Sequence, residues 1–220
     1  GKLPKELREV CYNYYNQKTI LKGLEDEDSK YTYNRQKALL NSCYGMLVQR
    51  LDRIEYHYIN NEYVPFKKPL DAQLDEFYNK RSSFLSYQHG CWVCAWARLA
   101  LYLGTEIAGA DLVYIDTDSV KYLGDHEEQF KKLNIMLRKN AEQNGAVAYN
   151  KDGEPFYIGV YDQEKTYTDF KTLRSKCYIY SYDNGKTIQS TISGVSKDVG
   201  AAFFTEHGFD ALHDGQKIPV

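Results

Sequence analysis

The tripeptide Asp116-Thr117-Asp118 is the part of this 220-residue chain whose residue types and spacing best suit chemistry. Strand-forming residues flank it at 111–115 and 119–123, which predicts a β-hairpin with both carboxylates at its tip. Two carboxylates this close repel one another, so at least one should have a raised pKa unless a cation lies between them. Carboxylate oxygens suit Mg²⁺ or Mn²⁺. The alternative interpretation is a solvated acidic turn.

A second candidate surface is the helix predicted from about residue 30 to 47, which has two different faces. One face combines two cations, an amide and two aromatic rings: Lys30, Tyr33, Lys37, Asn41 and Tyr44. The apolar residues lie roughly opposite: Leu39, Cys43, Met46 and Leu47. A cationic face suits a triphosphate, a Tyr ring suits a base or sugar, and Gly45 leaves room for close approach. The alternative is an ordinary amphipathic helix with a polar outer face.

The third candidate is the strand-like segment 173–180. Alternation predicts one face with basic and aromatic side chains: Arg174, Lys176, Tyr178 and Tyr180. It predicts that Leu173, Cys177 and Ile179 lie on the other face. Basic and aromatic groups on one face suit a nucleic-acid backbone with bases beside it. A solvated strand face is the alternative.

The elements that must position these residues form an α+β pattern, with helices packed on an antiparallel sheet. We expect helices at 4–22, 30–47, 89–109 and 126–144. Ser29 should cap the second helix, which forms a helical hairpin with the first, and the apolar helix 89–109 should pack on the acidic hairpin. Two further turns are predicted, at Asn60-Asn61 and at 183–185 (DNG).

Composition limits the functions that this chain can have. Hydrophobic residues make up 43% of the chain, so it should fold around a core. The net charge of −2 argues against nucleic-acid binding through bulk electrostatics, so any such contact needs a local basic face. Five cysteines favour reduced, intracellular thiols, and Cys91 and Cys94 lie in a helix predicted to be buried. No signal peptide or membrane span is expected, and the absence of an initial methionine suggests an excised piece.

Taken together and in order, the three segments resemble motifs of family B DNA polymerases. Residues 37–45 (KALLNSCYG) resemble the fingers pattern K-x-x-x-N-S-x-Y-G. Residues 114–119 (YIDTDS) and 176–178 (KCY) resemble the palm patterns Y-x-D-T-D-S and K-x-Y. Residues 95–98 (AWAR) resemble the protein-primed phage branch. The segment 46–88 is similar to an insertion of that branch in position and length, although not in residues.

The resemblance implies a DNA polymerase palm, an antiparallel sheet with packed helices, together with a helical-hairpin fingers subdomain. The expected parts are a fingers hairpin at 1–47, a β-rich insertion at 48–88, a palm at 89–192 and the start of a thumb at 193–220. In the related phage polymerases the insertion encircles template DNA and supports strand displacement.

The resemblance also implies roles for particular residues in a two-metal nucleotidyl transfer to a primer 3′-hydroxyl. The catalytic and metal-binding residues would be Asp116 and Asp118, with Mg²⁺ as the metal and Mn²⁺ as its substitute. The nucleotide-binding residues would be Lys18, Lys37, Asn41 and Tyr44. The DNA-binding residues would be Gly45, Lys176 and Tyr178. The implied partners are primer–template DNA, deoxynucleoside triphosphates and a terminal protein primer, without a membrane, in the cytoplasm of a bacterium hosting a phage or prophage.

The chain departs from the family pattern in one large respect. The family's other metal-binding aspartate lies in a D-x-x-S-L-Y-P pattern upstream of the fingers, and no segment here matches that pattern. We therefore expect a polymerase fragment that is inactive by itself. Two other functions stay open: a metal-dependent glycosyltransferase that uses Asp-x-Asp, and a non-catalytic DNA-binding remnant.

Overall fold

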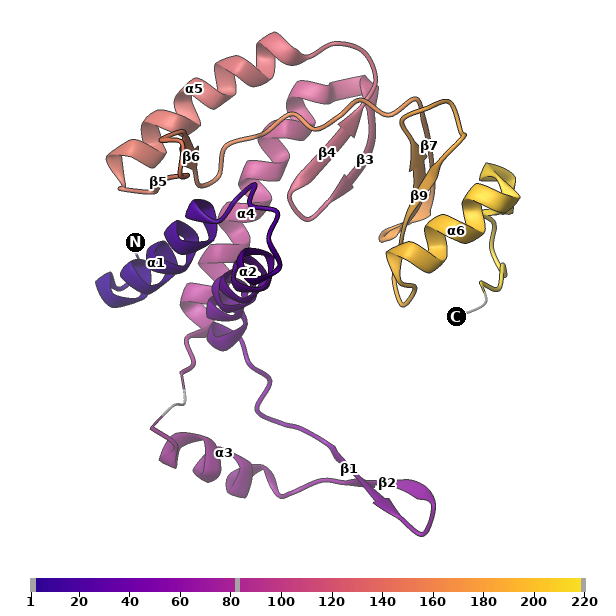
Figure 1. The fold of residues 1–220 in the computed structure, drawn as a ribbon. Helices are drawn as coiled ribbons and strands as arrows, with labels where there is room; N and C mark the ends of the chain where they lie inside the picture. Colours follow the sequence, from indigo (N-terminus) through magenta and orange to yellow (C-terminus); the bar gives the residue numbers. More distant parts are fainter. Residues whose placement is uncertain (1–2, 82–83, 219–220) are drawn as a thin grey trace. The chain divides into compact units, whose positions relative to one another are not determined.

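The computed structural model describes residues 3–81 and 84–218, and within them the chain is a mixed α+β protein with small antiparallel sheets (Figure 1). The residues outside this description are 1–2 of the predicted fingers hairpin, 82–83 of the predicted insertion and 219–220 of the predicted thumb. The helices are α1 (Lys5–Ile20), α2 (Glu27–Leu47), α3 (Leu70–Asn79), α4 (Tyr87–Ala108), α5 (Glu127–Gln143) and α6 (Lys197–His207), with 3₁₀ turns η1 (Gly109–Asp111) and η2 (Phe209–Ala211).

The strands pair only with neighbours in the sequence. β1 (Glu55–Ile59) pairs with β2 (Glu62–Phe66), and β3 (Leu112–Asp116) pairs with β4 (Ser119–Tyr122). β5 (Val147–Tyr149) pairs with β6 (Pro155–Tyr157), and the three-stranded sheet has the order β7 (Asp169–Arg174), β8 (Cys177–Ser181), β9 (Ile188–Ile192). The predicted α+β class is thus confirmed, but the antiparallel strands belong to several small sheets rather than to one.

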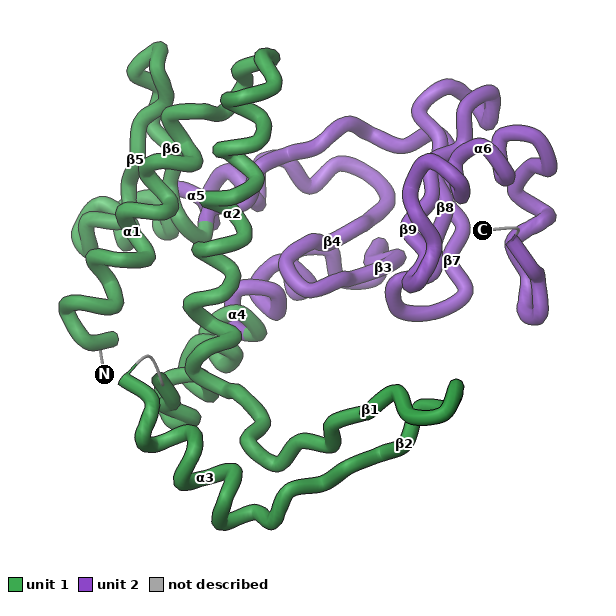
Figure 2. The backbone as a smooth tube through the Cα atoms, turned by 60° about the horizontal axis from the view of Figure 1, so that its bottom comes forward, with its two compact units in different colours: residues 1–98, 136–159 green, residues 99–135, 160–220 purple. Residues whose placement is uncertain are grey.

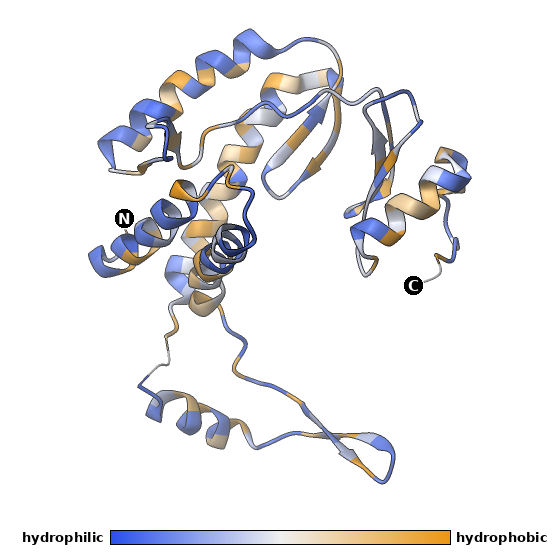
Figure 3. Cartoon of the chain, viewed as in Figure 1, coloured by the Kyte–Doolittle hydropathy of each residue, from blue (hydrophilic) through white to orange (hydrophobic). Residues whose placement is uncertain are grey.

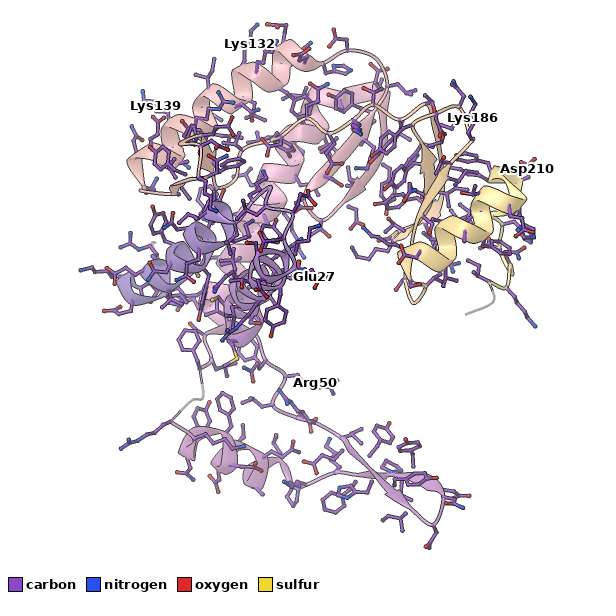
Figure 4. All side chains as sticks on the ribbon, viewed as in Figure 1. Glu27, Arg50, Lys132, Lys139, Lys186 and Asp210 are labelled. Atoms are coloured by element: carbon purple, nitrogen blue, oxygen red, sulfur yellow. The ribbon has the colours of Figure 1, made fainter. Side chains whose placement is uncertain are left out.

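The chain divides into two compact units (Figure 2). Unit 1 comprises residues 1–98 and 136–159, and unit 2 comprises residues 99–135 and 160–220. Helices α4 and α5 each run from one unit into the other. Figure 3 shows that α4 is apolar along much of its length whereas α5 is largely hydrophilic, and Figure 4 shows Lys132 and Lys139 projecting from α5. Within the described ranges, no helix combines the length and the apolar character that crossing a membrane requires.

In unit 1, helices α1 and α2 form the predicted helical hairpin. The residue that caps α2 is Asp26, whose Oδ1 accepts a hydrogen bond from the backbone N–H of Ser29 at 2.8 Å. The prediction of Ser29 as the cap was therefore wrong, because the helix begins about one turn earlier. Glu27 and Asp28 then fall in the first turn, where carboxylates stabilise the positive end of the helix dipole.

The insertion contains a second local hairpin that the sequence predicts correctly. Asn60 and Asn61 both have positive φ angles, 52° and 65°, as a type I′ turn between β1 and β2 requires. All residues of these two strands are exposed. Helix α3 follows them, so the segment predicted as a β-rich insertion contains a helix as well as a β-hairpin.

In unit 2, the C-terminal part of α4 packs on the acidic hairpin. A Cβ at Gly104 would lie 2.6 Å from the Tyr161 hydroxyl oxygen and 3.0 Å from Val120 Cγ2, so only glycine allows this approach. The Tyr161 hydroxyl donates to the Ala100 carbonyl at 2.7 Å, and its backbone N–H donates to the Asn134 side chain at 3.0 Å. The close approach of Gly104 to Val120 confirms the predicted packing of helix and hairpin, and Tyr161 connects α4 with α5 beside it.

The hydrophobic core of unit 2 lies between the three-stranded sheet and α6. It consists of Cys177, Ile179, Ile188, Phe204 and Leu212. The turn from β8 to β9 contains Asn184 and Gly185 with φ angles of 57° and 79°, as the sequence 183–185 predicts. The predicted division between palm and thumb, at 192–193, falls between β9 and α6, which share this core.

Candidate active site at the acidic hairpin

The acidic tripeptide forms the two-residue turn between β3 and β4. Asp116 pairs with Ser119 across the hairpin, and Thr117 and Asp118 connect them. This confirms that both carboxylates lie at the tip of a hairpin. The two differ in environment, because Asp118 is exposed whereas only 14% of the Asp116 side-chain surface is accessible to solvent.

Backbone geometry and hydrogen bonds hold Asp116 in place. Thr117 has a φ of 55°, which is an outlier for a β-branched residue and costs on the order of 1–3 kcal/mol. Its hydroxyl donates to Asp116 Oδ1 at 2.9 Å, and the backbone N–H of Asp118 donates to the Asp116 carbonyl at 2.6 Å. The turn therefore uses a strained conformation to fix the Asp116 carboxylate.

A second hairpin, β7–β8, brings a cation to this carboxylate. Lys176 Nζ donates to Asp116 Oδ1 at 2.7 Å and lies 3.5 Å from the Thr117 hydroxyl. The backbone N–H of Lys176 donates to the Tyr114 hydroxyl at 2.9 Å. Because Lys176 lies in the hairpin turn with a φ of 55°, its N–H and its side chain both reach the acidic hairpin. Two predicted motifs, 60 residues apart, thus meet in one site.

The ion pair sets the charge state of both partners. The Lys176 ammonium lowers the pKa of Asp116, the Thr117 hydroxyl adds to the effect, and partial burial opposes it. In turn, Asp116 raises the pKa of Lys176. The two shifts agree in sign. The raised pKa expected for a carboxylate pair is not found at Asp116, because a cation of the protein itself lies against it.

An aromatic surface extends from this ion pair along one face of the three-stranded sheet. Tyr178 contacts Tyr114 with ring centroids 5.1 Å apart and Tyr180 with centroids 6.1 Å apart. Tyr180 in turn contacts Tyr167 at 4.6 Å, and Lys121 lies 5.5 Å from the Tyr167 ring centre. Since Tyr178 and Tyr180 are half-buried while the alternate residues Cys177 and Ile179 are buried, the predicted separation of the two faces is confirmed for these four.

Arg174 was assigned to the wrong face. It pairs across the strands with Cys177, so it shares the face of the core residues, and its Nη1 lies 3.3 Å from Asp214 Oδ1. A register shift between Thr172 and Arg174 interrupts the strict alternation on which the prediction depended. Leu173, predicted to face the core, lies in this irregularity and is exposed.

The predicted nucleotide-binding cations lie together on α1 and α2 in unit 1. Lys18 has a lowered pKa because it is partly buried and because Lys37 and then Lys22 add repulsion. Lys37 is exposed. Two neighbouring ammonium groups favour an anion between them. Lys30, by contrast, pairs with Glu25 at 2.7 Å, so its charge is already compensated.

The remaining fingers residues lie at the C-terminal end of α2. Asn41 and Tyr44 are exposed, and a Cβ at Gly45 would have no atom within 4 Å, so the surface beside Tyr44 is open. The Tyr44 hydroxyl makes a 2.8 Å hydrogen bond with the Sγ of Cys94 on α4. Sequence reasoning missed this contact, because nothing local connects residues 50 positions apart. Both Cys91 and Cys94 are free thiols.

The possible metal ligands at the hairpin tip are the carboxylates of Asp116 and Asp118. Among the residues that the structure describes, no three His, Cys, Asp or Glu side chains are placed to hold a metal ion together. Mg²⁺ is commonly bound by one or two carboxylates, with waters and substrate phosphates completing its shell. In number and chemical type, the two carboxylates Asp116 and Asp118 suit a metal whose shell a phosphate-bearing substrate completes.

Comparison of the chain with protein-family models, with curated proteins and with solved structures finds no match in any of the three. The functional proposal therefore depends on the motifs of this sequence and on the geometry of the acidic hairpin.

Proposed function

We propose that this chain is part of a DNA-directed DNA polymerase of the family B type, which adds deoxynucleotides to a primer 3′-hydroxyl. The observation that carries the proposal is the 2.7 Å contact between Lys176 and Asp116. It joins the K-x-Y segment, which suits a nucleic-acid backbone, to the acidic turn, which suits a metal with a phosphate.

Each residue of the acidic site has a distinct part in this proposal. Asp118 is exposed at the hairpin tip and is the direct metal ligand, with Asp116 as the weaker partner beside it. The bound Mg²⁺ would supply charge stabilisation for the transferred phosphoryl group. Lys176 and the ring of Tyr178 contact the primer terminus, since an ammonium suits a phosphate and an aromatic ring suits a base.

The α1–α2 hairpin contributes the nucleotide-binding part. Lys18 and Lys37 bind the triphosphate, because mutual repulsion makes this pair of cations a favourable place for an anion. Tyr44, with Asn41 and Gly45 beside it, forms an open surface for the nascent base pair. At the acidic hairpin, Asp116 and Asp118 would provide only part of a two-metal site. The further carboxylate would come from the D-x-x-S-L-Y-P segment, which this sequence does not contain.

The test is template-directed primer extension in Mg²⁺ and, separately, in Mn²⁺. The chain alone should not extend a primer measurably, since a two-metal transfer needs carboxylates on both sides of the ions. Addition in trans of a polypeptide carrying the D-x-x-S-L-Y-P segment should restore extension, and Asp118→Asn should abolish it again. Robust extension by the chain alone, lost in Asp118→Asn, would show that another carboxylate replaces the missing one. Transfer from a sugar nucleotide instead would refute the polymerase proposal.

A further inference from the structure

The acidic turn carries an internal cation at the position where a metal ligand is proposed. Asp116 Oδ1 accepts hydrogen bonds from both Lys176 Nζ, at 2.7 Å, and the Thr117 hydroxyl, at 2.9 Å. A carboxylate oxygen has two lone pairs, so these two donors occupy it. An ammonium and a divalent cation on the same carboxylate would also repel each other strongly. A metal ion at Asp116 would therefore have to bind through Oδ2 and would still be repelled by the Lys176 ammonium, so the two cations oppose one another at this carboxylate.

Lys176 is the partner that is free to move. Its side chain is 56% exposed, whereas that of Asp116 is 14% exposed. The backbone of Lys176 is tied to the Tyr114 hydroxyl through its N–H, independently of the ammonium group. Because a lysine ammonium sits on a flexible four-carbon stem, it can leave Asp116 while the hairpin stays in place.

We propose that Lys176 and a divalent cation compete for Asp116, and that a primer phosphate releases the site by drawing Lys176 away. The inference rests on the proposed polymerase function for the identity of the phosphate. Lys176 keeps the negative charge at the turn compensated in the absence of DNA. When a nucleic-acid phosphate takes the ammonium, Asp116 becomes available to the metal. DNA and metal then bind with positive coupling, and each increases the affinity for the other by the same factor.

Removal of a lysine that merely stabilises the site should weaken Mn²⁺ binding. Removal of a lysine that competes with the metal should strengthen it. Lys176→Ala should bind Mn²⁺ more tightly than wild type when no DNA is present, by roughly fivefold to tenfold, the size of a charge-assisted hydrogen bond that is partly screened. Because Lys176 has a positive φ angle, Lys176→Asn is a second variant whose backbone tolerates this conformation. Mn²⁺ affinity is measured by electron paramagnetic resonance at fixed ionic strength.

Two controls separate competition from a change in net charge. Lys165→Ala removes the same charge from unit 2, at a residue whose ammonium lies 5.8 Å from the Tyr182 ring, and should leave Mn²⁺ affinity within about twofold of wild type. In an Asp116→Asn background, Lys176→Ala should have no effect, since the shared carboxylate is gone. An effect that persists in that background would overturn the inference.

The second arm adds primer–template DNA. DNA should raise the Mn²⁺ affinity of the wild-type chain by a factor similar to that of Lys176→Ala, and should raise that of Lys176→Ala little further. Equal Mn²⁺ affinities of wild type and both Lys176 variants without DNA, or no Mn²⁺ binding at millimolar concentrations, would refute competition. If DNA leaves the wild-type affinity unchanged while the variants bind Mn²⁺ more tightly, the coupling to DNA is refuted. Primer extension is scored separately, so the proposed function can fail or stand independently of these results.

Discussion

Replacement of Gly90 by alanine tests how α4 meets α2 within unit 1. Gly90 is buried, and a Cβ at this position would overlap Val48 Cγ1 and lie 3.5 Å from Leu47 Cβ. The backbone N–H of Ser86 also donates to the Leu47 carbonyl at 3.0 Å, so the two helices are already tied at this crossing. One turn further along α4, Cys94 meets Tyr44. The crossing therefore also positions a proposed nucleotide-binding residue.

The size of the effect follows from two opposing contributions. An extra methyl group in a well-packed contact typically costs about 1–3 kcal/mol. Alanine in place of glycine inside a helix stabilises the folded state by roughly 0.5–1 kcal/mol. We expect Gly90→Ala to lower the free energy of unfolding by about 1–2 kcal/mol, as measured by urea denaturation. Gly45→Ala is the matched control, since its Cβ would meet no atom within 4 Å and it should stabilise the chain by about 0.5 kcal/mol.

A double-mutant cycle identifies the colliding atom. Val48→Ala removes Cγ1, so it should restore part of the stability that Gly90→Ala loses, with a coupling energy of about 1 kcal/mol. Additive losses in the double variant would contradict the proposed collision. A Gly90→Ala variant as stable as wild type would refute the close approach of the two helices.

Four further predictions concern the proposed site and the core. Lys37→Ala should raise the apparent KM for nucleotides in the restored extension assay more than it weakens DNA binding; an unchanged KM with lost DNA affinity would assign Lys37 to the template. Lys176→Ala should weaken primer–template binding and reduce the salt slope by about one, whereas Tyr178→Phe keeps the ring and should matter less; wild-type affinity in both would leave this face a solvated surface. The pKa of Asp116 is lower in the folded chain, so its contribution to stability is complete above the unfolded pKa of about 4 and is lost as the pH falls through the folded value. The stability difference between wild type and Asp116→Asn, from urea titrations at several pH values, should therefore shrink below about pH 4; a difference that grows there would contradict the ion pair. Phe204→Ala should cost about 3–5 kcal/mol of unfolding free energy, because Phe204 is fully buried in the core of unit 2, and a loss below about 1 kcal/mol would place it outside that core.

Turns were predictable from the sequence because their chemistry is local. Asn60 and Asn61 tolerate positive φ angles, and so do Asn184 and Gly185, so each pair indicates a hairpin without any knowledge of the rest of the chain. Thr117 is the exception, because a β-branched residue is unfavourable at a φ of 55°. The acidic hairpin was found there from its flanking strand residues and its motif.

Other features depended on contacts that local patterns do not contain. The alternation that placed Arg174 beside Tyr178 fails at a register shift, which is a property of the strand pair rather than of one strand. The prediction chose Ser29 as the cap of α2, but Asp26, which is also a favourable capping residue, makes the cap one turn earlier. The contact between Tyr44 and Cys94 has no sequence signature at all.

The two parts of the acidic site were predictable from the sequence, but the contact between them was not. The motifs of the acidic turn and of Lys176 were each visible in the sequence. Their ion pair depends on two hairpins meeting through Tyr114, and it lowers the pKa of Asp116, as a cation beside the carboxylate pair should. Residue types therefore led to the prediction of a metal site, whereas the ion pair between Lys176 and Asp116 could be found only from the three-dimensional arrangement.

The most direct test of the polymerase proposal is a crystal structure of the chain with primer–template DNA, a deoxynucleoside triphosphate and Mn²⁺, using the anomalous signal of manganese. We expect a manganese peak within bonding distance of Asp118, with the triphosphate on Lys37 and with Lys176 released from Asp116 onto a primer phosphate. Manganese at another set of ligands, or DNA bound with Lys176 still on Asp116 and no metal at the acidic turn, would contradict it.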